Sequence, residues 1–185
     1  MSAVREALFD AADALLRRAS WSSVSMAVLA AHAGVSRQTL YNEFGTRDEF
    51  AQAWVVREAE RFVAKFESAF DGHRDPRLAL RRAFIVFLRE AAVNPTVRQI
   101  LGAEAGSSEL LALFTTKGGP VLELATARVA RKLRERWPRT TAARARAGAE
   151  CLVRLAISHA TLASGPPAAS ARAVADVVAG YVVRD

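Results

Sequence analysis

The chain has little cysteine, no long apolar run and no signal-peptide pattern in its first residues. Its 185 residues include one cysteine, Cys151, which excludes an intramolecular disulfide and fits a reducing compartment. No apolar run approaches the roughly 18–20 residues that span a bilayer, and residues 1–6 lack the layout of a signal peptide. Hydrophobic residues make up 51% of the chain, which is enough for a sizeable core. We therefore expect an ordered, cytoplasmic protein that does not enter a membrane.

Signals of catalysis and of metal binding are also scarce. The three histidines, His32, His73 and His159, have no second ligand at a spacing typical of a metal site. The sequence contains no GxGxxG, GxxxxGK[ST] or GxSxG motif. Cys151 follows Glu150 among apolar neighbours, a setting that favours packing over nucleophilic chemistry. We expect no metal, no cofactor and no enzymatic activity.

The net charge of +7 is unevenly distributed along the chain. Residues 1–50 hold five arginines against six acidic residues, whereas residues 121–185 hold eleven basic against five acidic residues. The excess positive charge is therefore concentrated in the last third of the chain. Net charge alone is no evidence for DNA binding here.

Hydrophobic periodicity predicts an all-α fold, because apolar residues recur at three to four and no stretch alternates with period two. About nine helices are expected, together with a further short helix at residues 109–116. Their ranges are 3–19, 26–33, 37–44, 47–70, 76–93, 95–101, 120–137, 141–163 and 169–183. We place a DNA-binding domain at residues 1–46 and a ligand-binding and dimerisation domain at residues 47–185.

The most informative stretch runs from residue 25 to residue 49 and begins with a short amphipathic helix. The hydroxyl of Ser25 can cap this helix by accepting from an orphan N–H group. Gly34 lies where the helix must stop, a position that favours a left-handed residue without a Cβ. One face of the helix carries Met26, Leu29, Ala30 and Ala33.

A second helix follows, with Ser36 as its expected cap. Leu40 and Phe44 share its inner face, and the outward residues are Arg37, Gln38, Thr39, Tyr41 and Asn42. Arginine and glutamine can contact base edges, whereas the other types reach bases or phosphates. A helix, a turn that contains glycine and a second helix together indicate a helix-turn-helix. In this motif the second helix enters a major groove. The alternative is an ordinary helical hairpin with a polar outer face.

Residues 39–50 resemble the TLYxHFxxKxxL pattern of TetR-type transcriptional regulators, and residues 21–35 resemble the first half of that family's helix-turn-helix. The specific resemblance covers roughly residues 3–57. It implies DNA binding by Ser25, Ser36, Arg37, Gln38, Thr39, Tyr41, Asn42 and Arg47. Two positions depart from the pattern: Arg47 replaces the usual lysine and keeps its charge, whereas Glu43 replaces the frequent histidine. A carboxylate there would repel a phosphate unless Arg37 or Arg47 pairs with it.

The expected helix at 47–70 would link the helix-turn-helix to the remainder of the chain. Thr46 and Glu49 form the sequence signature of a capping box at its start. Aromatic residues on this helix and on later helices could line a cavity or could equally be ordinary core. The resemblance implies a ligand pocket between these helices for a hydrophobic or amphipathic effector. The candidate lining residues are Phe62, Phe66, Phe84, Phe87 and Phe114, with Glu104, Thr115, Arg154 and His159 as polar anchors.

The last two expected helices carry more apolar residues than a lone surface helix needs, which favours a self-association surface. The alternative is that both simply complete the monomer core. The resemblance implies dimerisation through these helices, and a two-fold dimer predicts a palindromic operator with half-sites one DNA turn apart. The candidate interface residues are Leu152, Leu155, His159, Leu162, Val174, Val178 and Tyr181.

These features predict a homodimeric repressor that binds a double-stranded DNA operator and leaves it when a small effector binds. Three other functions stay open. The acidic balance of residues 1–50 and Glu43 favour a ligand- or protein-binding scaffold without DNA binding. An all-α enzyme would depend on His159 or Cys151. A membrane-surface protein would use the basic residues 128–146.

Overall fold

The computed structural model describes residues 2–100, 108–163 and 165–183. The described residues are helical and contain no strand, as predicted. The helices are α1 Ala3–Leu16, α2 Met26–His32, α3 Arg37–Phe44, α4 Arg47–Ser68, α5 Pro76–Val93, α6 Pro95–Ile100, α7 Ser108–Ala112, α8 Gly119–Arg136, α9 Ala142–Thr161 and α10 Pro167–Val182, with a 3-10 turn at Trp21–Ser23.

Short polar side chains begin several of these helices, as the sequence predicts. Ser25 and Ser36 accept from the backbone N–H groups of Val28 and Thr39 at 3.3 and 3.0 Å. Thr46 and Glu49 form the expected capping box at the start of α4. Orphan N–H groups of the first turn are thereby satisfied within each segment, so these boundaries are decided locally.

Helix ends depart more from prediction than helix starts. The first helix was expected to continue to Ala19, but α1 ends at Leu16 because the N–H groups of Arg18 and Ala19 both turn back to the carbonyl of Leu15. Helix α4 ends at Ser68, two residues before the expected Phe70. The short α7 covers residues 108–112 rather than 109–116.

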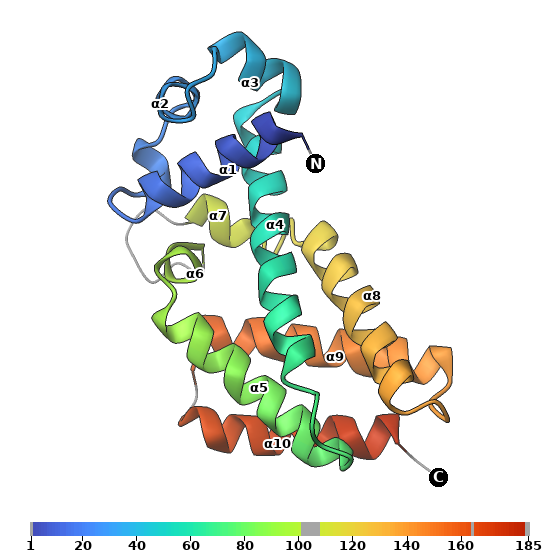
Figure 1. Cartoon of the computed structure of the whole chain (residues 1–185). Helices are drawn as coiled ribbons and strands as arrows, with labels where there is room; N and C mark the ends of the chain where they lie inside the picture. Colours follow the sequence, from blue (N-terminus) through green and yellow to red (C-terminus); the bar gives the residue numbers. More distant parts are fainter. Residues whose placement is uncertain (1, 101–107, 164, 184–185) are drawn as a thin grey trace.

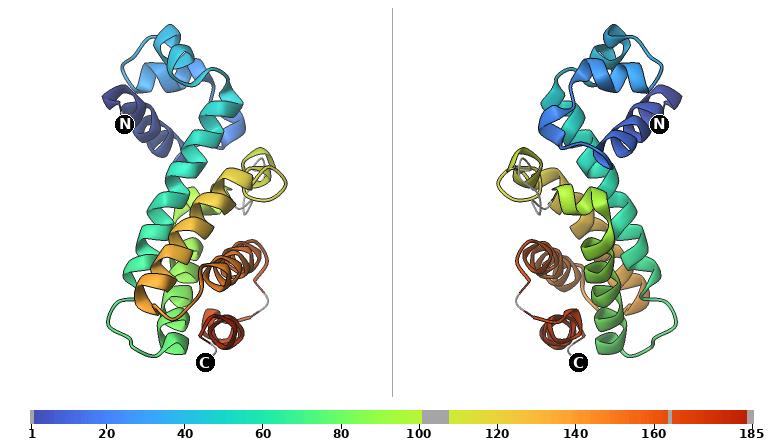
Figure 2. Two further views of the ribbon diagram at one scale, coloured as in Figure 1. Left: turned by 90° about the vertical axis from the view of Figure 1, so that its right-hand side faces the viewer. Right: turned by 90° about the vertical axis from the view of Figure 1, so that its left-hand side faces the viewer.

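Helix α4 is the spine of the molecule, with α1 to α3 at one end and α5 and α8 to α10 at the other (Figure 1). The chain termini lie at these opposite ends. The two further views show α9 and α10 nearly end-on, so both run across the direction of α4 (Figure 2). Helix α4 packs both against α1 to α3 and against the C-terminal helices.

Two apolar cores lie along α4. The first joins α1 to α3 with the first half of α4 and includes the fully buried Leu8, Leu40, Phe50 and Trp54. The second joins the end of α4 to α5, α8, α9 and α10 around Phe70 and Phe84. Trp21 is 1% exposed and its ring stacks 6.4 Å from that of Trp54, so it belongs to the first core. Because α4 contributes to both cores, the division after residue 46 stays a prediction.

Candidate nucleic-acid interface and apolar cavity

Helix α3 presents the outward face that the sequence predicts. Arg37, Gln38, Tyr41 and Asn42 are exposed, whereas Leu40 and Phe44 anchor the opposite face in the first core. The side chain of Gln38 donates to Asn42 at 2.8 Å, which aligns the two amides one helical turn apart. Thr39 is half-buried, and its hydroxyl lies 2.8 Å from that of Ser36. The exposed face thus consists mainly of the four larger side chains.

The turn between α2 and α3 has the geometry that the glycine predicts. Gly34 has a φ of 69°, and the next residue, Val35, donates to the carbonyl of Ala30 at 3.0 Å. This hydrogen bond closes the end of α2 around a left-handed residue. A Cβ on Gly34 would meet no atom within 4 Å, so the backbone conformation alone favours glycine.

Glu43 is paired, but with a residue that the sequence analysis did not select. Its Oε1 accepts from Nη1 of Arg5 at 3.2 Å, and the Arg5 guanidinium lies 4.3 Å from the Phe44 ring centre. Arg5 thus supplies the pairing that the sequence analysis considered only for Arg37 or Arg47. Arg5 is on α1, and no local spacing links it to α3. Pairing reduces the repulsion that an isolated carboxylate would exert on a phosphate.

The guanidinium of Arg47 points into the molecule rather than joining the α3 face, which corrects its predicted placement. It donates to the carbonyls of Trp21 and Val24 at 2.8 and 3.4 Å, and to Glu109 of α7 at 2.8 and 2.9 Å. It also lies 4.4 Å from the Trp21 ring centre. Two backbone carbonyls, a carboxylate and an aromatic face outcompete a solvent-exposed orientation. Arg47 therefore fastens the start of α4 to α7.

An apolar cavity of about 80 Å³ lies between α4, α5, α8 and α9, and α6 adds Val97 and Ile100 to its wall. Four of the predicted lining residues are present, namely Phe62, Phe66, Phe87 and Phe114. Aliphatic side chains from α8 and α9 complete the wall, including Val121, Val129, Leu152 and Ala156. Glu58 is the only charged residue in the described lining. Such a cavity suits an apolar molecule.

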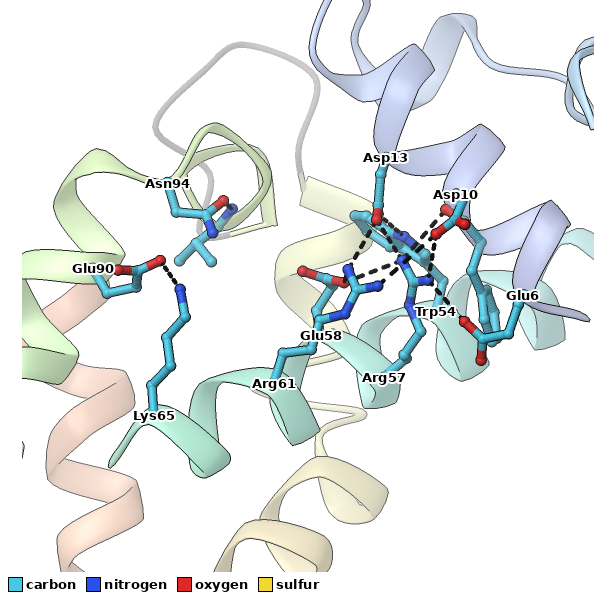
Figure 3. Close-up of polar contacts among 12 residues, drawn as sticks. Glu6, Asp10, Asp13, Trp54, Arg57, Glu58, Arg61, Lys65, Glu90 and Asn94 are labelled. Carbon is cyan, nitrogen blue, oxygen red and sulfur yellow. Dashed lines mark hydrogen bonds and ion pairs between the residues drawn. The ribbon is translucent and has the colours of Figure 1, made fainter. Parts of the chain in front are cut away.

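Glu58 is the functional candidate that sequence reasoning missed. It is 4% exposed, and its Oε1 accepts from Arg57 and Arg61 at 3.3 and 2.9 Å (Figure 3). Burial raises the pKa of its carboxyl, and the charge of Asp13 adds to this, while Arg61 and Arg57 oppose it. The sequence feature that could have identified Glu58 is a charged pair, Arg57 and Glu58, on the aromatic face of α4.

Comparison with known proteins identifies the family. Residues 8–54 match the model of the bacterial regulatory proteins of the tetR family, and residues 75–180 match the model of the bacterial tetracyclin repressor C-terminal domain. The chain belongs to the TetR family. Members of this family are transcriptional regulators, so the chain is a TetR-family transcriptional regulator with a DNA-binding domain and is not an enzyme.

Individual TetR-family relatives cover nearly the whole chain. The HTH-type transcriptional regulator AlkX of Mycobacterium tuberculosis is 34% identical over 175 residues, which are 94% of this chain and 81% of that protein. The crystal structure of the TetR family repressor AlkX from Dietzia sp. strain DQ12-45-1b, implicated in biodegradation of n-alkanes, is 35% identical, has a TM-score of 0.81 and covers 96% of this chain and 94% of that chain. RolR in complex with resorcinol, at 16% identity and a TM-score of 0.64 over 97% of this chain and 87% of that chain, shares the fold.

Three residues predicted for the ligand pocket of this TetR-family chain lie outside the cavity. Phe84 is fully buried in the second core, and the His159 ring meets it edge-on at 5.9 Å. Arg154 is exposed and bonds Glu150 on its own helix at 2.8 Å. The correction has a helical reason: Leu152 and Ala156 face inward, so Arg154, two positions from either, points outward.

Of the two other predicted polar anchors, Thr115 is not part of the described cavity lining. The exposed Thr115 donates its hydroxyl to the carbonyl of Leu111 at 3.0 Å. Glu104 lies outside the described residues. Among the residues described, no group of three or more histidine, cysteine, aspartate or glutamate side chains could hold a metal ion. None of the described helices has the length and apolar character that a membrane-spanning segment requires.

The predicted dimer residues of this TetR-family chain divide into three groups by burial. Leu152, Val174 and Val178 are at most 4% exposed because they pack in the core of their own chain, which corrects their assignment to an intersubunit surface. Leu162 and Tyr181 are exposed by 79% and 47%. Leu155 and His159 are half-buried. The outer face of α10 also carries Val177, which is 70% exposed and was not assigned to the interface.

The raised pKa of Glu58 predicts a pH-dependent stability. The native state holds this proton more tightly than the unfolded chain, so the free energy of unfolding falls as pH rises from the ordinary value of 4.5 through the native pKa. Glu58→Gln should lack this contribution. Urea unfolding of both proteins between about pH 4.5 and about pH 7.5 should show the stability difference shifting in favour of Glu58→Gln as pH rises. A difference that does not change with pH would contradict the prediction.

Proposed function

We propose that this TetR-family regulator is a homodimeric repressor that leaves a palindromic operator when a small apolar molecule fills the cavity. The observation that carries this proposal is the continuity of α4. One half of α4 packs in the core that holds α3, and the other half lines the cavity. An occupant of the cavity can therefore act on α3 through one rigid helix. It shifts the equilibrium only by its differential affinity for the two states.

The proposed DNA contacts are on α3. Arg37 and Gln38 are side chains that make bidentate contacts to guanine and adenine edges, and Tyr41 and Asn42 reach phosphates or bases. Ser25, Ser36 and Thr39 lie at or near helix starts, where backbone N–H groups also favour a phosphate. Arg47 is left out of this set because its guanidinium is bonded to Trp21 and Glu109.

The proposed effector is a hydrocarbon or a molecule with a hydrocarbon body. Phenylalanine and aliphatic side chains form nearly all of the described cavity wall, so apolar surface drives binding. The AlkX relative from Dietzia is implicated in biodegradation of n-alkanes, which supports this chemical class. The proposal places binding in the same cavity between α4, α5, α8 and α9.

The proposed dimer uses the outer faces of α9 and α10. Their exposed apolar residues are Leu162, Val177 and Tyr181, with the half-buried Leu155 and His159 nearby on α9. A two-fold axis would bring the same patch of two chains together. It would also set the two α3 helices about 34–36 Å apart, to meet successive major grooves.

Selection of bound duplexes from a random DNA pool tests the DNA-binding proposal. At about 0.15 M salt, the wild type should enrich a palindrome, and the Arg37→Ala, Tyr41→Ala double variant should not. Each lost base contact is worth about 1–3 kcal/mol, so affinity for the enriched duplex should fall by more than tenfold. Arg77 is exposed at the start of α5, and α5 lies at the opposite end of the molecule from α3 (Figure 1). Arg77→Ala is therefore the control and should bind like the wild type.

A folded, dimeric wild type that enriches no sequence would contradict the repressor proposal. That result would favour the scaffold function that the sequence analysis left open. If the double variant still binds an enriched palindrome, the sequence-specific DNA contacts do not lie on α3.

A further inference from the structure

Six charged residues gather where α1 crosses α4. They are Glu6, Asp10 and Asp13 of α1 and Arg57, Glu58 and Arg61 of α4, hereafter the α1–α4 charge cluster (Figure 3). The three acids follow one another along one face of α1, and the α4 residues point toward them. None of the six belongs to the proposed DNA-contacting face.

Arg57 is the centre of the cluster and is 4% exposed. Its two terminal nitrogens reach Asp13 at 2.5 Å, Asp10 at 3.2 Å and Glu6 at 3.5 Å. It also lies 4.8 Å from the ring centre of Phe9. One buried guanidinium thus holds α1 at three successive points, and it fixes how α1 lies on α4.

Glu58 links this cluster to the cavity. Its side chain lines the cavity beside Ala59 and Phe62, while its carboxylate accepts from Arg57 and Arg61. The same two arginines donate to Oδ2 of Asp13, at 2.5 and 3.0 Å. Glu58 on the cavity side and Asp13 on the α1 side therefore share both donors. A movement of either carboxylate changes the hydrogen bonds available to the other.

We propose that Glu58 is a positioning residue. It couples occupation of the cavity to the ion pairs that fix α1 on α4. This inference rests on the proposed function. An occupant that presses on the Glu58 side chain moves its carboxylate relative to Arg57 and Arg61. The arginines then redistribute between Asp10 and Asp13, and α1 shifts on α4. The shift reaches α3 because Phe9 of α1 packs against Phe44 of α3, with ring centres 5.3 Å apart.

Burial is the reason that a small displacement can have a large effect. The Arg57 and Glu58 side chains are 4% and 6% exposed, so water replaces a lost hydrogen bond poorly. The nearby ion pair between Lys65 of α4 and Glu90 of α5 lacks this property. The Lys65 side chain is 51% exposed, and the pair does not touch α1 (Figure 3). It supplies a matched control on the same helix.

The test measures the coupling between probe and DNA in three proteins: wild type, Glu58→Gln and Lys65→Gln. The probe is 1-octanol, a neutral molecule with a hydrocarbon body, and the DNA is the duplex that the wild type enriches. Affinity for DNA is measured with and without saturating 1-octanol, and affinity for 1-octanol is measured on each free protein. The ratio of the two DNA affinities is the coupling, and allosteric couplings typically span about 5–150-fold.

We expect 1-octanol to weaken DNA binding by the wild type and by Lys65→Gln by at least about fivefold. In Glu58→Gln the ratio should fall to within about twofold of unity when it is measured at a 1-octanol concentration that saturates this variant. Glutamine keeps the shape of the side chain and removes a buried charge, so the fold should persist, as circular dichroism can verify. Arg61→Gln removes the same link from the other side and should also lower the ratio.

The outcomes separate the inference from the proposed function. A Glu58→Gln protein that keeps the wild-type ratio would overturn the role of Glu58 and leave ligand-responsive DNA binding intact. A wild type that does not bind 1-octanol, or that binds it without a change in DNA affinity, would overturn the apolar effector and the coupling together.

Discussion

Replacing Arg57 with methionine should lower the free energy of unfolding by about 3–5 kcal/mol. The substitution removes the central cation of the α1–α4 charge cluster and leaves Asp13 and Glu58 facing each other, with side chains only 14% and 6% exposed. Breaking a buried ion pair from one side is more damaging than never forming it, because the remaining charge stays desolvated. Arg61 bonds both carboxylates and limits the loss.

Urea unfolding followed by circular dichroism measures this change, with two comparison variants. Arg57→Lys keeps a positive charge but lacks the planar fork that reaches several carboxylates, so its loss should be smaller than that of Arg57→Met. Arg131→Met removes a surface pair with Glu135, whose side chains are 60% and 53% exposed, and a 3.4 Å contact with Glu67, which keeps Arg128 as a partner. It should cost less than about 1 kcal/mol. A loss for Arg57→Met no larger than that of Arg131→Met would show that the cluster does not hold α1.

Replacing Phe50 with alanine should cost about 3–5 kcal/mol of unfolding free energy and also weaken DNA binding. Phe50 is fully buried on α4, and its ring centre lies 4.9 Å from that of Phe44 on α3 and 5.8 Å from that of Phe9 on α1. It thus joins three helices at one point. The cavity left by alanine removes contacts from each of them, and α3 loses its fixed orientation on α4.

Denaturant unfolding and titration of the selected duplex test the two parts separately. Leu78→Ala, a change of an apolar residue that is 49% exposed on α5, should alter stability by about 0.5 kcal/mol or less. It should leave DNA affinity unchanged. If Phe50→Ala binds the duplex as tightly as the wild type while still folded, the first core does not orient α3 as we describe.

The helix-turn-helix was predictable from sequence because its signals are local. Ser25, Ser36 and Thr46 cap helices within three residues of themselves, and Gly34 has the positive φ that its position predicts. Leu40 and Phe44 lie four residues apart, so a helix places them on one side regardless of what covers them. The exposed face of α3 follows from the same spacing.

The partners of charged residues were not predictable in this way. Glu43 pairs with Arg5 across 38 positions, and Arg47 pairs with Glu109 across 62. Spacing along the chain carries no information about such pairs, because they depend on how α1 and α7 approach α3 and α4. The same limit applies to the cavity. Helical periodicity marks Phe84 as inward-facing just as it marks Phe87, and only the packing of α9 and α10 on α5 separates core from lining.

The sequence by itself determined that this protein is all-α, that a helix-turn-helix occupies its first part and that α3 presents Arg37, Gln38, Tyr41 and Asn42. These features depend on caps, turns and periodicity, which act over a few residues. Three outcomes needed the tertiary structure: which apolar residues of α9 and α10 stay exposed, that Arg47 bonds Trp21 and Glu109, and that Glu58 lies between a cavity and the α1–α4 charge cluster. Those outcomes depend on burial and on contacts between distant segments, and both arise only when the helices pack.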